Sequence, residues 1–421
     1  MKISLIQPSR NNLKYLKWSY DSIRKNQGDH EVEICVADDF SDKDDTWEWC
    51  VEMMGKDPHF KAIKNEGPTR LGHTILYDRL VNEVATHDMC MIYHADMYLC
   101  PGALDAIEDN MHTYHHEGND LPTYIKNEKT IVSLTRIEPP LHPPGPEKVL
   151  RDFGIEPEEF KEAELLNDLN NIADWGAGKH FTTEGIFAPW AFWKKDFQEI
   201  GGHDAIFAPQ SKEDTDIFNR FHLNGIKFIQ TWEGFVYHMT CRGSRFADGA
   251  KRNPDGEVFM KNRETDEWLA QNQKSTREFI RKWGHFCKHD QYMKPIVPPK
   301  YEIGIVVENC NAQLLEALEP WCSYIYVDME EFVVYSMKEQ EKSSFNIDER
   351  VKGFDPNKHV IKDNITIKVN GNIFNQQDYQ IITQLSEIIQ ESGEIGEFEL
   401  GNLKIQINDL TMYENDLIIA K

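Results

Sequence analysis

The sequence predicts a mixed α/β fold, a sheet flanked by helices, followed by a smaller α+β region at the carboxyl end. Three observations predict it. Apolar runs alternate with amphipathic segments between residues 1 and 110, acidic residues follow these runs, and the composition shifts after the proline-rich stretch 295–299. Alternation of this kind indicates a parallel sheet, and such sheets bind ligands at the carboxyl ends of their strands.

Apolar runs predict the strands, and apolar residues three or four positions apart predict the helices. In the first part of the chain, strands are expected at 3–7, 32–37 and 89–93, and helices at 11–26 and 74–85. Further along, strands are expected at 186–192 and 227–238, with a helix at 213–223 between them.

An insertion interrupts this pattern at 136–180. Its first part, EPPLHPPGP at 138–146, cannot form a helix or a central strand, because proline lacks the N–H donor and fixes φ. An acidic helical segment then leads to the glycine-rich stretch 175–178. Such an insertion is either a lid or acceptor-binding loop, or a plain surface excursion.

The length of 421 residues indicates two domains, at roughly 100–200 residues per domain. We expect a catalytic domain at 1–295 and an acidic α+β accessory domain at 301–421, which carries 22 acidic and 9 basic side chains. Strand-like runs at 303–307, 324–327, 365–369 and 403–407 accompany a helix near 379–390. No chemical motif marks this region; self-association into a homo-oligomer and the holding of a long acceptor are two hypotheses for it.

The charge balance limits the partners. With 71 acidic and 46 basic side chains the net charge is -25, which argues against a nucleic-acid partner. It does not exclude a nucleotide, because a divalent metal can bridge carboxylates to a diphosphate. No stretch approaches about 18 apolar residues, so no membrane span is expected. The first residues resemble a strand and not a secretion signal, and the eight cysteines form no C-x-x-C pair. We therefore expect a cytoplasmic protein with reduced thiols.

Two acidic turns follow predicted strands. His94-Ala95-Asp96 follows 89–93, where a carboxylate can coordinate a hard cation; the alternative is that Asp96 caps the helix after Pro101. Asp38-Asp39 follows 32–37, where one carboxylate can accept hydrogen bonds from a base or ribose. The alternative for this pair is a solvated turn, and only the continuation of the strand favours Asp38 over Asp39.

Two further signals lie later in the chain. Ser211 and Asp214 have the spacing of a capping box, and Asp214 would then only satisfy backbone amides. Alternatively, an ionised Asp214 at a helix N-terminus can accept the proton of a sugar hydroxyl. His238 ends the strand 227–238 and can complete a metal site, and Arg242 and Arg245 behind it can offset diphosphate charge. Most single histidines, however, are not ligands.

Together these segments resemble the GT-A nucleotide-sugar glycosyltransferases, both the broad family-2 type and, more closely, the beta-1,4-galactosyltransferase type. The resemblance covers about residues 2–245. The matching motifs are Pro8-Ser9-Arg10-Asn11 with Leu13-Lys14-Tyr15, His94-Ala95-Asp96 at the D-x-D position, Gly201-Gly202, Glu213-Asp214-Thr215-Asp216-Ile217-Phe218-Asn219-Arg220, and Gly225.

The resemblance implies roles for individual residues. It implies that Asp96 and His238 bind Mn²⁺ (or Mg²⁺) and that Asp214 is the catalytic base. It also implies that Glu213 binds acceptor or donor hydroxyls. The nucleotide pocket would be shaped by Pro8 and Arg10, with Asp38 and Arg10 against the uridine and His94-Ala95-Asp96 near the diphosphate.

The chain departs from the galactosyltransferase pattern at three places. His94 replaces the first Asp of D-x-D, and Phe235 stands where a methionine ligand would precede His238. The tryptophan-glycine segment before the Glu-Asp pair is replaced by residues 207–212. The resemblance therefore does not imply which acceptor is used.

Together with this resemblance, these observations predict a metal-dependent glycosyltransferase that moves a hexose or N-acetylhexosamine from a UDP-sugar to a glycan hydroxyl, as in polysaccharide biosynthesis. The resemblance alone implies that the transfer proceeds with inversion. Trp175 or Trp190 could stack on a sugar, although core packing is favoured for Trp190. One alternative is a nucleotidyltransferase that makes nucleotide sugars, but the glycine-rich phosphate loop it needs is missing from residues 7–12. The other is a catalytically silent binding scaffold, which the incomplete D-x-D would suit.

Overall fold

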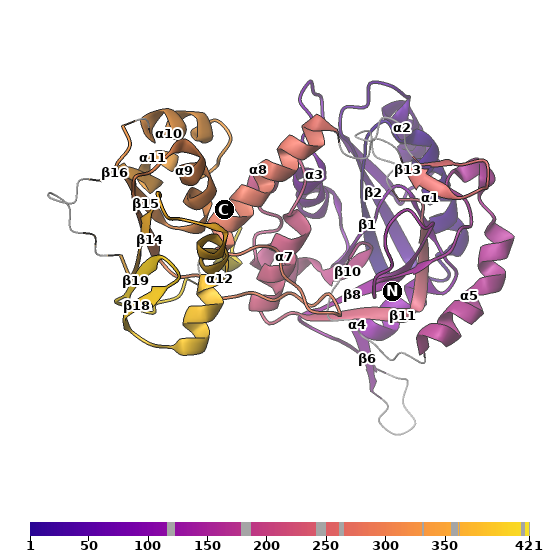
Figure 1. Ribbon diagram of the computed structural model, residues 1–421. Coiled ribbons are helices and arrows are strands. Elements are labelled where there is room, and N and C mark those ends of the chain that lie inside the picture. The colour runs from indigo at the N-terminus through magenta and orange to yellow at the C-terminus, as the bar shows by residue number, and fades with distance from the viewer. Residues whose placement is uncertain are drawn as a thin grey trace. The chain divides into compact units, whose positions relative to one another are not determined.

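The structure is a computed structural model that describes residues 1–115, 123–177, 187–240, 250–260, 265–330, 332–354, 361, 363–413 and 417–420 (Figure 1). Two compact units divide the chain. The N-terminal unit comprises Met1–Pro209, Ile217–Leu269 and His289–Pro295, and the C-terminal unit comprises Gln210–Asp216, Ala270–Lys288 and Ile296–Lys421. That the first is a catalytic domain and the second an accessory domain stays a prediction.

The first half of the N-terminal sheet is parallel. Its strands, in the spatial order β3-β2-β1-β4, are β1 (Lys2–Ser9), β2 (Glu31–Asp38), β3 (Phe60–Lys64) and β4 (Met89–Ile92). The connecting helices are α1 (Leu13–Asn26), α2 (Thr46–Lys56), α3 (His73–Arg79) and the π-helical turn η1 (Leu80–Val84). The inner strands are buried along nearly their whole length, as expected for parallel strands covered on both faces.

The second half of the sheet is mixed. β10 (Trp190–Trp193) runs antiparallel to β4 and to the next strand, β8 (Thr130–Glu138). β11 (Lys227–His238) lies parallel to β8, and β5 (Met97–Leu99) closes the order antiparallel to β11. β9 (Lys148–Leu150) pairs with the end of β8. The mixed sheet flanked by helices confirms the predicted fold class.

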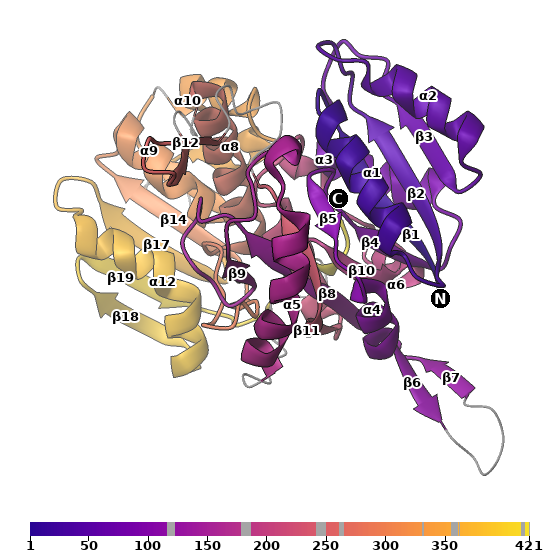
Figure 2. The same ribbon diagram turned by 90° about the vertical axis from the view of Figure 1, so that its right-hand side faces the viewer.

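The remaining elements of the N-terminal part lie around this sheet. They are α4 (Ala103–Met111), η2 (Pro157–Glu159), α5 (Glu162–Ala177), α6 (Lys194–Glu199), η3 (Ala205–Phe207), α7 (Glu213–Leu223), and the hairpins β6–β7 (His112–His115, Thr123–Lys126) and β12–β13 (Ala250–Arg252, Val258–Met260). The next helix, α8 (Asp266–Trp283), belongs to the C-terminal unit from Ala270 on. The β6–β7 hairpin projects from the end of α4 (Figure 2). No helix among the described residues is long and apolar enough to cross a membrane.

Apolar spacing explains how the helices pack on this sheet. α1 contributes Leu16 and Ile23, and α4 contributes Leu104 and Ile107, to one hydrophobic core with strand residues such as Leu5. All of these side chains are at most 1% exposed. The predicted helix at 74–85 is present as α3 followed by a π-helical turn.

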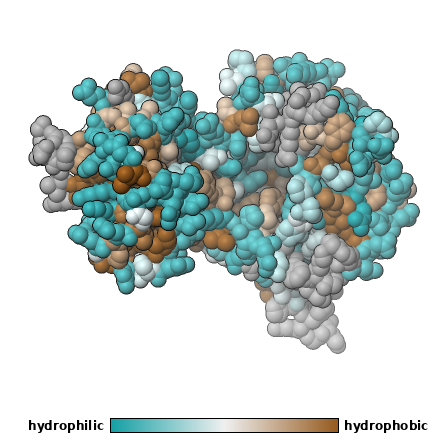
Figure 3. All heavy atoms as spheres, in the orientation of Figure 1, coloured by the Kyte–Doolittle hydropathy of each residue, from teal (hydrophilic) through white to brown (hydrophobic). Residues whose placement is uncertain are grey.

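The C-terminal unit has its own sheet, in the order β16-β15-β14-β17-β19-β18. The strands are β14 (Ile303–Glu308), β15 (Tyr324–Val327), β16 (Val351–Gly353), β17 (Ile365–Asn370), β18 (Gly396–Leu400) and β19 (Leu403–Ile407). The helices are α9 (Ala312–Leu318), η4 (Glu319–Trp321), α10 (Phe332–Gln340), α11 (Ile347–Arg350) and α12 (Gln376–Ser392). Hydrophilic side chains cover most of the face of this unit seen in Figure 3, in keeping with its acidic composition.

The two sheets share a strand order. In each sheet, the first four strands are parallel in the order 3-2-1-4. The fourth strand is followed in space by a strand from later in the chain, which runs antiparallel to both of its neighbours. Its second neighbour comes before it in the sequence. β10 takes this place in the N-terminal sheet, and β19 takes it in the C-terminal sheet. The C-terminal unit is thus a reduced version of the same topology.

A buried charge cluster lies in the C-terminal unit. Glu319 is fully buried, and its carboxylate contacts Arg281 (Nε, 3.1 Å), Arg350 (Nε, 2.7 Å) and Arg277 (Nη2, 3.2 Å). Burial alone would raise the pKa of Glu319, but Arg281 and Arg350 outweigh it and lower the pKa to about 2. The ionised carboxylate therefore belongs to the folded state.

We expect Glu319→Gln to lower the free energy of unfolding by about 3–5 kcal/mol, because it leaves buried guanidinium groups without their counter-charge. The wild-type contribution should be constant above about pH 4.5 and lost as the pH falls towards 2, because folding lowers this pKa. Urea denaturation from pH 7 to pH 3 measures both. Glu316→Gln, at an exposed position on α9, is the matched control. Equal stabilities of the two variants at pH 7 would contradict the argument.

Candidate functional site

The parallel register brings the first group of predicted residues to one edge of the N-terminal sheet. Pro8 pairs with Ala37, and Ser9 pairs with Asp38, at the carboxyl ends of β1 and β2. Arg10 and Asp39 follow directly. These are the ends at which a doubly wound sheet binds ligands.

The two aspartates at this edge have different partners. Asp39 accepts hydrogen bonds from the backbone N–H groups of Leu71 (2.9 Å) and Gly72 (2.8 Å) and from Asn65 Nδ2 (2.8 Å), so it holds the loop before α3. Asp38 is fully buried and accepts from the N–H of Ser41 (3.2 Å). Burial raises its pKa, against the hydrogen bonds from Ser41. Neither residue is the solvated turn that was the alternative, and their contact with a nucleotide stays a prediction.

Two arginines lie at the same edge. Arg10 Nη2 is 3.7 Å from Asp42 Oδ1, and its buried Nε has no hydrogen-bond partner among the described residues. Arg70 Nε lies 3.5 Å from Asp39 Oδ2, and burial together with the charge of Arg10 lowers the pKa of Arg70 against the opposing effect of Asp39. Two guanidinium groups whose charges act on each other at one edge of the sheet suit a bound anion. The sequence did not single out Arg70, because an arginine in an irregular loop carries no pattern.

A group of possible metal ligands lies beyond the carboxyl end of the next strand, β4. His94, Asp96 and His238 each offer one ligand atom, and these atoms all lie within 4.8 Å of one another. His94 and Asp96 lie between β4 and β5, and His238 ends β11 opposite Met97 of β5. Asp96 does not cap α4, whose N-cap residue is Gly102. Ala95, between the two ligands, is part of the hydrophobic core, and its predicted contact with a nucleotide sugar stays a prediction.

The donor set fits a divalent transition ion. Two imidazoles and one carboxylate suit Mn²⁺ better than Mg²⁺, which prefers oxygen ligands and keeps several waters. Burial lowers the pKa of His94 to about 3, so this imidazole is neutral and its nitrogen lone pair is available. His238 Nε2 lies 3.3 Å from Asp96 Oδ1, on the side facing the other two ligands.

Glu138 fixes the orientation of His238. Nδ1 of His238 donates to Glu138 Oε1 at 2.8 Å, which directs Nε2 towards Asp96. Burial lowers the pKa of His238, but Asp96 and Glu138 outweigh it and raise the pKa to about 9, so a metal ion at Nε2 would replace a proton. Glu138 is 2% exposed, and burial is offset by Arg136, His238 and Lys148, which hold its pKa well below the usual range.

Sequence reasoning missed Glu138 as a part of the site. It begins the proline-rich segment 138–146, which marked a loop, while the structure makes it the last residue of β8. β8 pairs with β11, so the ends of both strands lie together. The available signal was the run of β-branched and apolar residues at 130–135, which is typical of a buried strand that could continue to Glu138.

The predicted catalytic pair opens α7. Glu213 is buried and Asp214 is exposed, which leaves the Asp214 carboxylate accessible to a substrate. The capping-box interpretation is wrong: α7 begins at Glu213, so Ser211 is not its N-cap residue, and Ser211 Oγ donates to Asn272 Oδ1 at 2.8 Å. Ser211 and Lys212 have φ of 84° and 72°, whereas an N-cap residue is extended.

Among the tryptophans considered for sugar stacking, Trp190 is 1% exposed and packs against Phe192, Phe218 and Phe221, so it belongs to the core. The side chain of Trp175 lies outside the described residues. Arg242 and Arg245, which were expected to offset diphosphate charge, lie outside them as well.

Residues 4–156 match the sequence model of a family described as Glycosyl transferase family 2. This range contains the edge formed by β1 and β2 and two of the three possible metal ligands, His94 and Asp96. His238 and the α7 pair lie beyond it. No curated protein matches the chain.

Solved structures show weak similarity. A mannosyltransferase from Pyrobaculum calidifontis in complex with GDP-Man and Mn²⁺ is 15% identical over 58% of this chain, with a TM-score of 0.37. GalNAc-T7 with UDP, GalNAc and Mn²⁺ is 12% identical over 69% of this chain, with a TM-score of 0.42. TarS of S. aureus is 12% identical over 66%, with a TM-score of 0.36. The chain spans 59%, 49% and 40% of these three structures.

We expect Glu138→Gln to weaken Mn²⁺ binding by about 10–100-fold, because loss of the outer carboxylate leaves His238 less firmly oriented and less basic. Calorimetric titration of the purified protein with Mn²⁺ measures this. Glu158→Gln, at an exposed position, is the control and should bind as the wild type does. Equal Mn²⁺ affinities of the two variants would show that Glu138 has no part in metal binding.

Proposed function

We propose that the protein is a metal-dependent glycosyltransferase that moves a hexose or N-acetylhexosamine from a UDP-sugar to a glycan hydroxyl with inversion. The observation that carries the proposal is the cluster of His94, Asp96 and His238 at the carboxyl edge of a sheet whose first part matches a glycosyl transferase family. Metal ligands at this edge suit a diphosphate, which a divalent ion can hold against the acidic surroundings.

The nucleotide would bind beside this cluster. Pro8 lies half-buried near the carboxyl end of β1, and Arg10 and Arg70 supply positive charge at the edge that carries Asp38 and Asp39. The buried Nε of Arg10 is a donor for which an anionic or carbonyl oxygen is the natural partner. His94, Asp96 and His238 would hold Mn²⁺, which when bound supplies Lewis-acid stabilisation of the diphosphate.

Asp214 would act as the base. Its exposed carboxylate accepts the proton of the acceptor hydroxyl while that oxygen forms a bond to the anomeric carbon. The bond from that carbon to the diphosphate oxygen breaks on the opposite face, and UDP leaves with the electron pair. Glu213, at the start of the same helix, would bind sugar hydroxyls. A single displacement of this kind needs no protein nucleophile.

We expect Asp214→Asn to lower kcat by about 10²–10⁴-fold and to leave Mn²⁺-dependent UDP binding nearly unchanged, because the amide cannot accept the proton. The measurement is UDP release from a panel of UDP-sugars with mixed glycan acceptors, in Mn²⁺ or in EDTA. Asp174→Asn, at an exposed position on α5, is the control.

The outcomes separate the competing functions. Release that requires both metal and Asp214 supports the proposal and identifies the donor. Release that persists in Asp214→Asn would assign the base to another residue. UDP binding without release from any donor would favour the silent binding scaffold, and pyrophosphate release from a sugar phosphate and UTP would favour the nucleotidyltransferase.

A further inference from the structure

The segment with the proposed base folds with the C-terminal unit. Residues Gln210–Asp216 belong to that unit, although the chain on both sides of them, up to Pro209 and from Ile217, belongs to the N-terminal unit. The first turn of α7 contacts α8, which belongs to the same unit from Ala270 on.

Asp216 fixes this turn. Its carboxylate accepts from Lys282 Nζ at 2.7 Å and from Trp283 Nε1 at 2.9 Å, both on α8. The three side chains are at most 1% exposed. A buried carboxylate with two such donors is costly to move, because any displacement separates charges in a medium of low dielectric constant. Asp216 N–H also donates to Lys212 O at 2.9 Å, so the turn is held as a unit.

The same helix holds the residues that precede the turn. Gln210 O accepts from Gln271 Nε2 (3.3 Å) and from Ser275 Oγ (3.2 Å), and Ser211 donates to Asn272. Ser211 and Lys212 are both in the left-handed region, which is unfavourable for a residue that is not glycine. Such a conformation persists only where surrounding contacts impose it, and α8 supplies those contacts.

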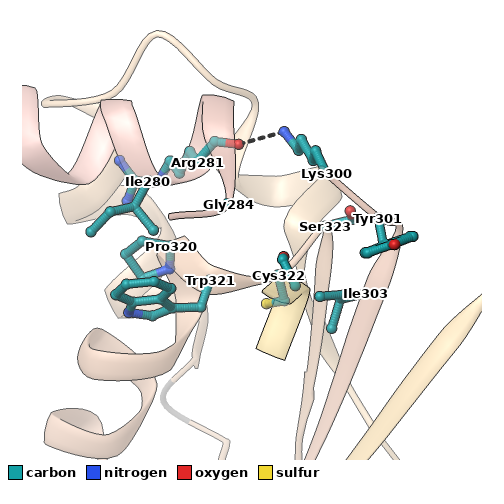
Figure 4. Close-up of a pocket in the computed structure, with 11 residues that line it drawn as sticks. Ile280, Arg281, Gly284, Lys300, Tyr301, Ile303, Pro320, Trp321, Cys322 and Ser323 are labelled. Carbon is teal, nitrogen blue, oxygen red and sulfur yellow. Dashed lines mark hydrogen bonds between the residues drawn. The ribbon is translucent and has the colours of Figure 1, made fainter. Parts of the chain in front are cut away.

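The end of α8 is itself fixed. Gly284, at φ 78°, donates its N–H to Ile280 O at 2.7 Å, which closes the helix as left-handed glycines commonly do. Figure 4 shows the Lys300 amine directed at the carbonyl of Arg281, at 2.7 Å, and the same amine also donates to Lys282 O. A cation at a helix C-terminus is favourable, so the position of Lys282 is set by the C-terminal unit.

We propose that Lys282 and Trp283 are positioning residues for Asp214, and that the C-terminal unit supports catalysis by holding the first turn of α7. The inference rests on the proposed function, because it takes Asp214 as the base. Asp214 and Asp216 lie on one helical turn, so a tilt of that turn moves the exposed carboxylate of Asp214. A displacement of about 1 Å at a reacting group can cost about 10²-fold in rate.

Three variants test this. Lys282→Met removes the charged partner of Asp216. Trp283→Phe removes the N–H donor of the indole but keeps an aromatic ring, so its effect should be smaller. Lys282→Arg keeps the charge and should restore most of the function. Lys338→Met, an identical substitution at an exposed position on α10, is the matched control.

The first readout is hydrogen exchange, which needs no substrate. We expect the amides of 213–217 to exchange at least about 10-fold faster in Lys282→Met, and faster in Trp283→Phe, than in Lys338→Met, while β1 and β4 keep their protection. Wild-type exchange at 213–217 in both variants would overturn the proposal. If Lys282→Met loses protection from exchange throughout the chain, because it fails to fold, the exchange of Trp283→Phe at 213–217 decides whether the proposal holds.

The second readout is UDP release from the UDP-sugar panel. We expect kcat to fall by about 10–100-fold in Lys282→Met, with KM for the donor and Mn²⁺-dependent UDP affinity changed less than about 2-fold, and to recover in Lys282→Arg. Adding Lys282→Met to Asp214→Asn should cause no further loss, because Lys282 acts through Asp214. The inference would be overturned if the losses of the two single variants multiplied in the double variant. A change in KM without a change in kcat in Lys282→Met would overturn it as well.

The two proposals fail in different ways. If the wild type releases no UDP from any donor, the proposed function fails, and the exchange data still decide whether Lys282 holds the turn. If Asp214→Asn is inactive but Lys282→Met turns over at the wild-type rate, the proposed function stands and the positioning role is refuted.

Discussion

The hydrogen bond between His238 and Glu138 fixes the polar centre of the N-terminal unit. It connects the ends of two paired strands, β8 and β11, and leaves the other imidazole nitrogen facing Asp96. Without Glu138, the ring could turn, and a buried cationic histidine would lack its second carboxylate. This bond sets the direction of the His238 ring, and so it also sets where Nε2 lies relative to the other two possible metal ligands, His94 and Asp96. The proposed binding of a metal ion by these three residues depends on that geometry.

Buried charge is used in a similar way elsewhere. In the C-terminal unit, Glu319 is enclosed by arginines from α8 and α11, and Asp216 is enclosed by Lys282 and Trp283. Buried ion pairs of this type add little net stability over apolar packing, but they tolerate very few alternative arrangements. Buried charged residues thus occur where a side chain has to keep one defined position. Two of the three buried clusters belong to the proposed site: one contains the possible metal ligand His238, and the other contains Asp216, two residues from Asp214.

The repeated strand order in the two units shows how one topology serves different roles. The first four strands of each sheet run 3-2-1-4, followed by an antiparallel strand. At the end of its fourth strand, the N-terminal unit has His94-Ala95-Asp96, while the C-terminal unit has Asn370-Gly371-Asn372. After the second strand, Asp328 of the C-terminal unit accepts from the amides of Asn309 (2.6 Å) and Cys310 (2.9 Å). This carboxylate is therefore engaged in holding the loop that follows β14, and the amide residues lack the charge that a metal ion needs.

Local pattern in the sequence predicted several of the elements, although not β3, β8 or α4. Period-2 and period-3.6 spacing gave the helix 213–223, the strand 227–238 and the C-terminal strands 324–327 and 403–407 with the bounds the structure has, because apolar spacing alone decides which face is buried. The sequence also pointed to His94 and Asp96, which lie just after an apolar run, and to His238, which ends one. Only the tertiary structure decided that these three meet, that Glu138 orients one of them, and that Asp216 is held by residues almost seventy positions later. The physical reason is that strand pairing and buried charge contacts join segments far apart in the chain, and no local pattern records which segments will be neighbours.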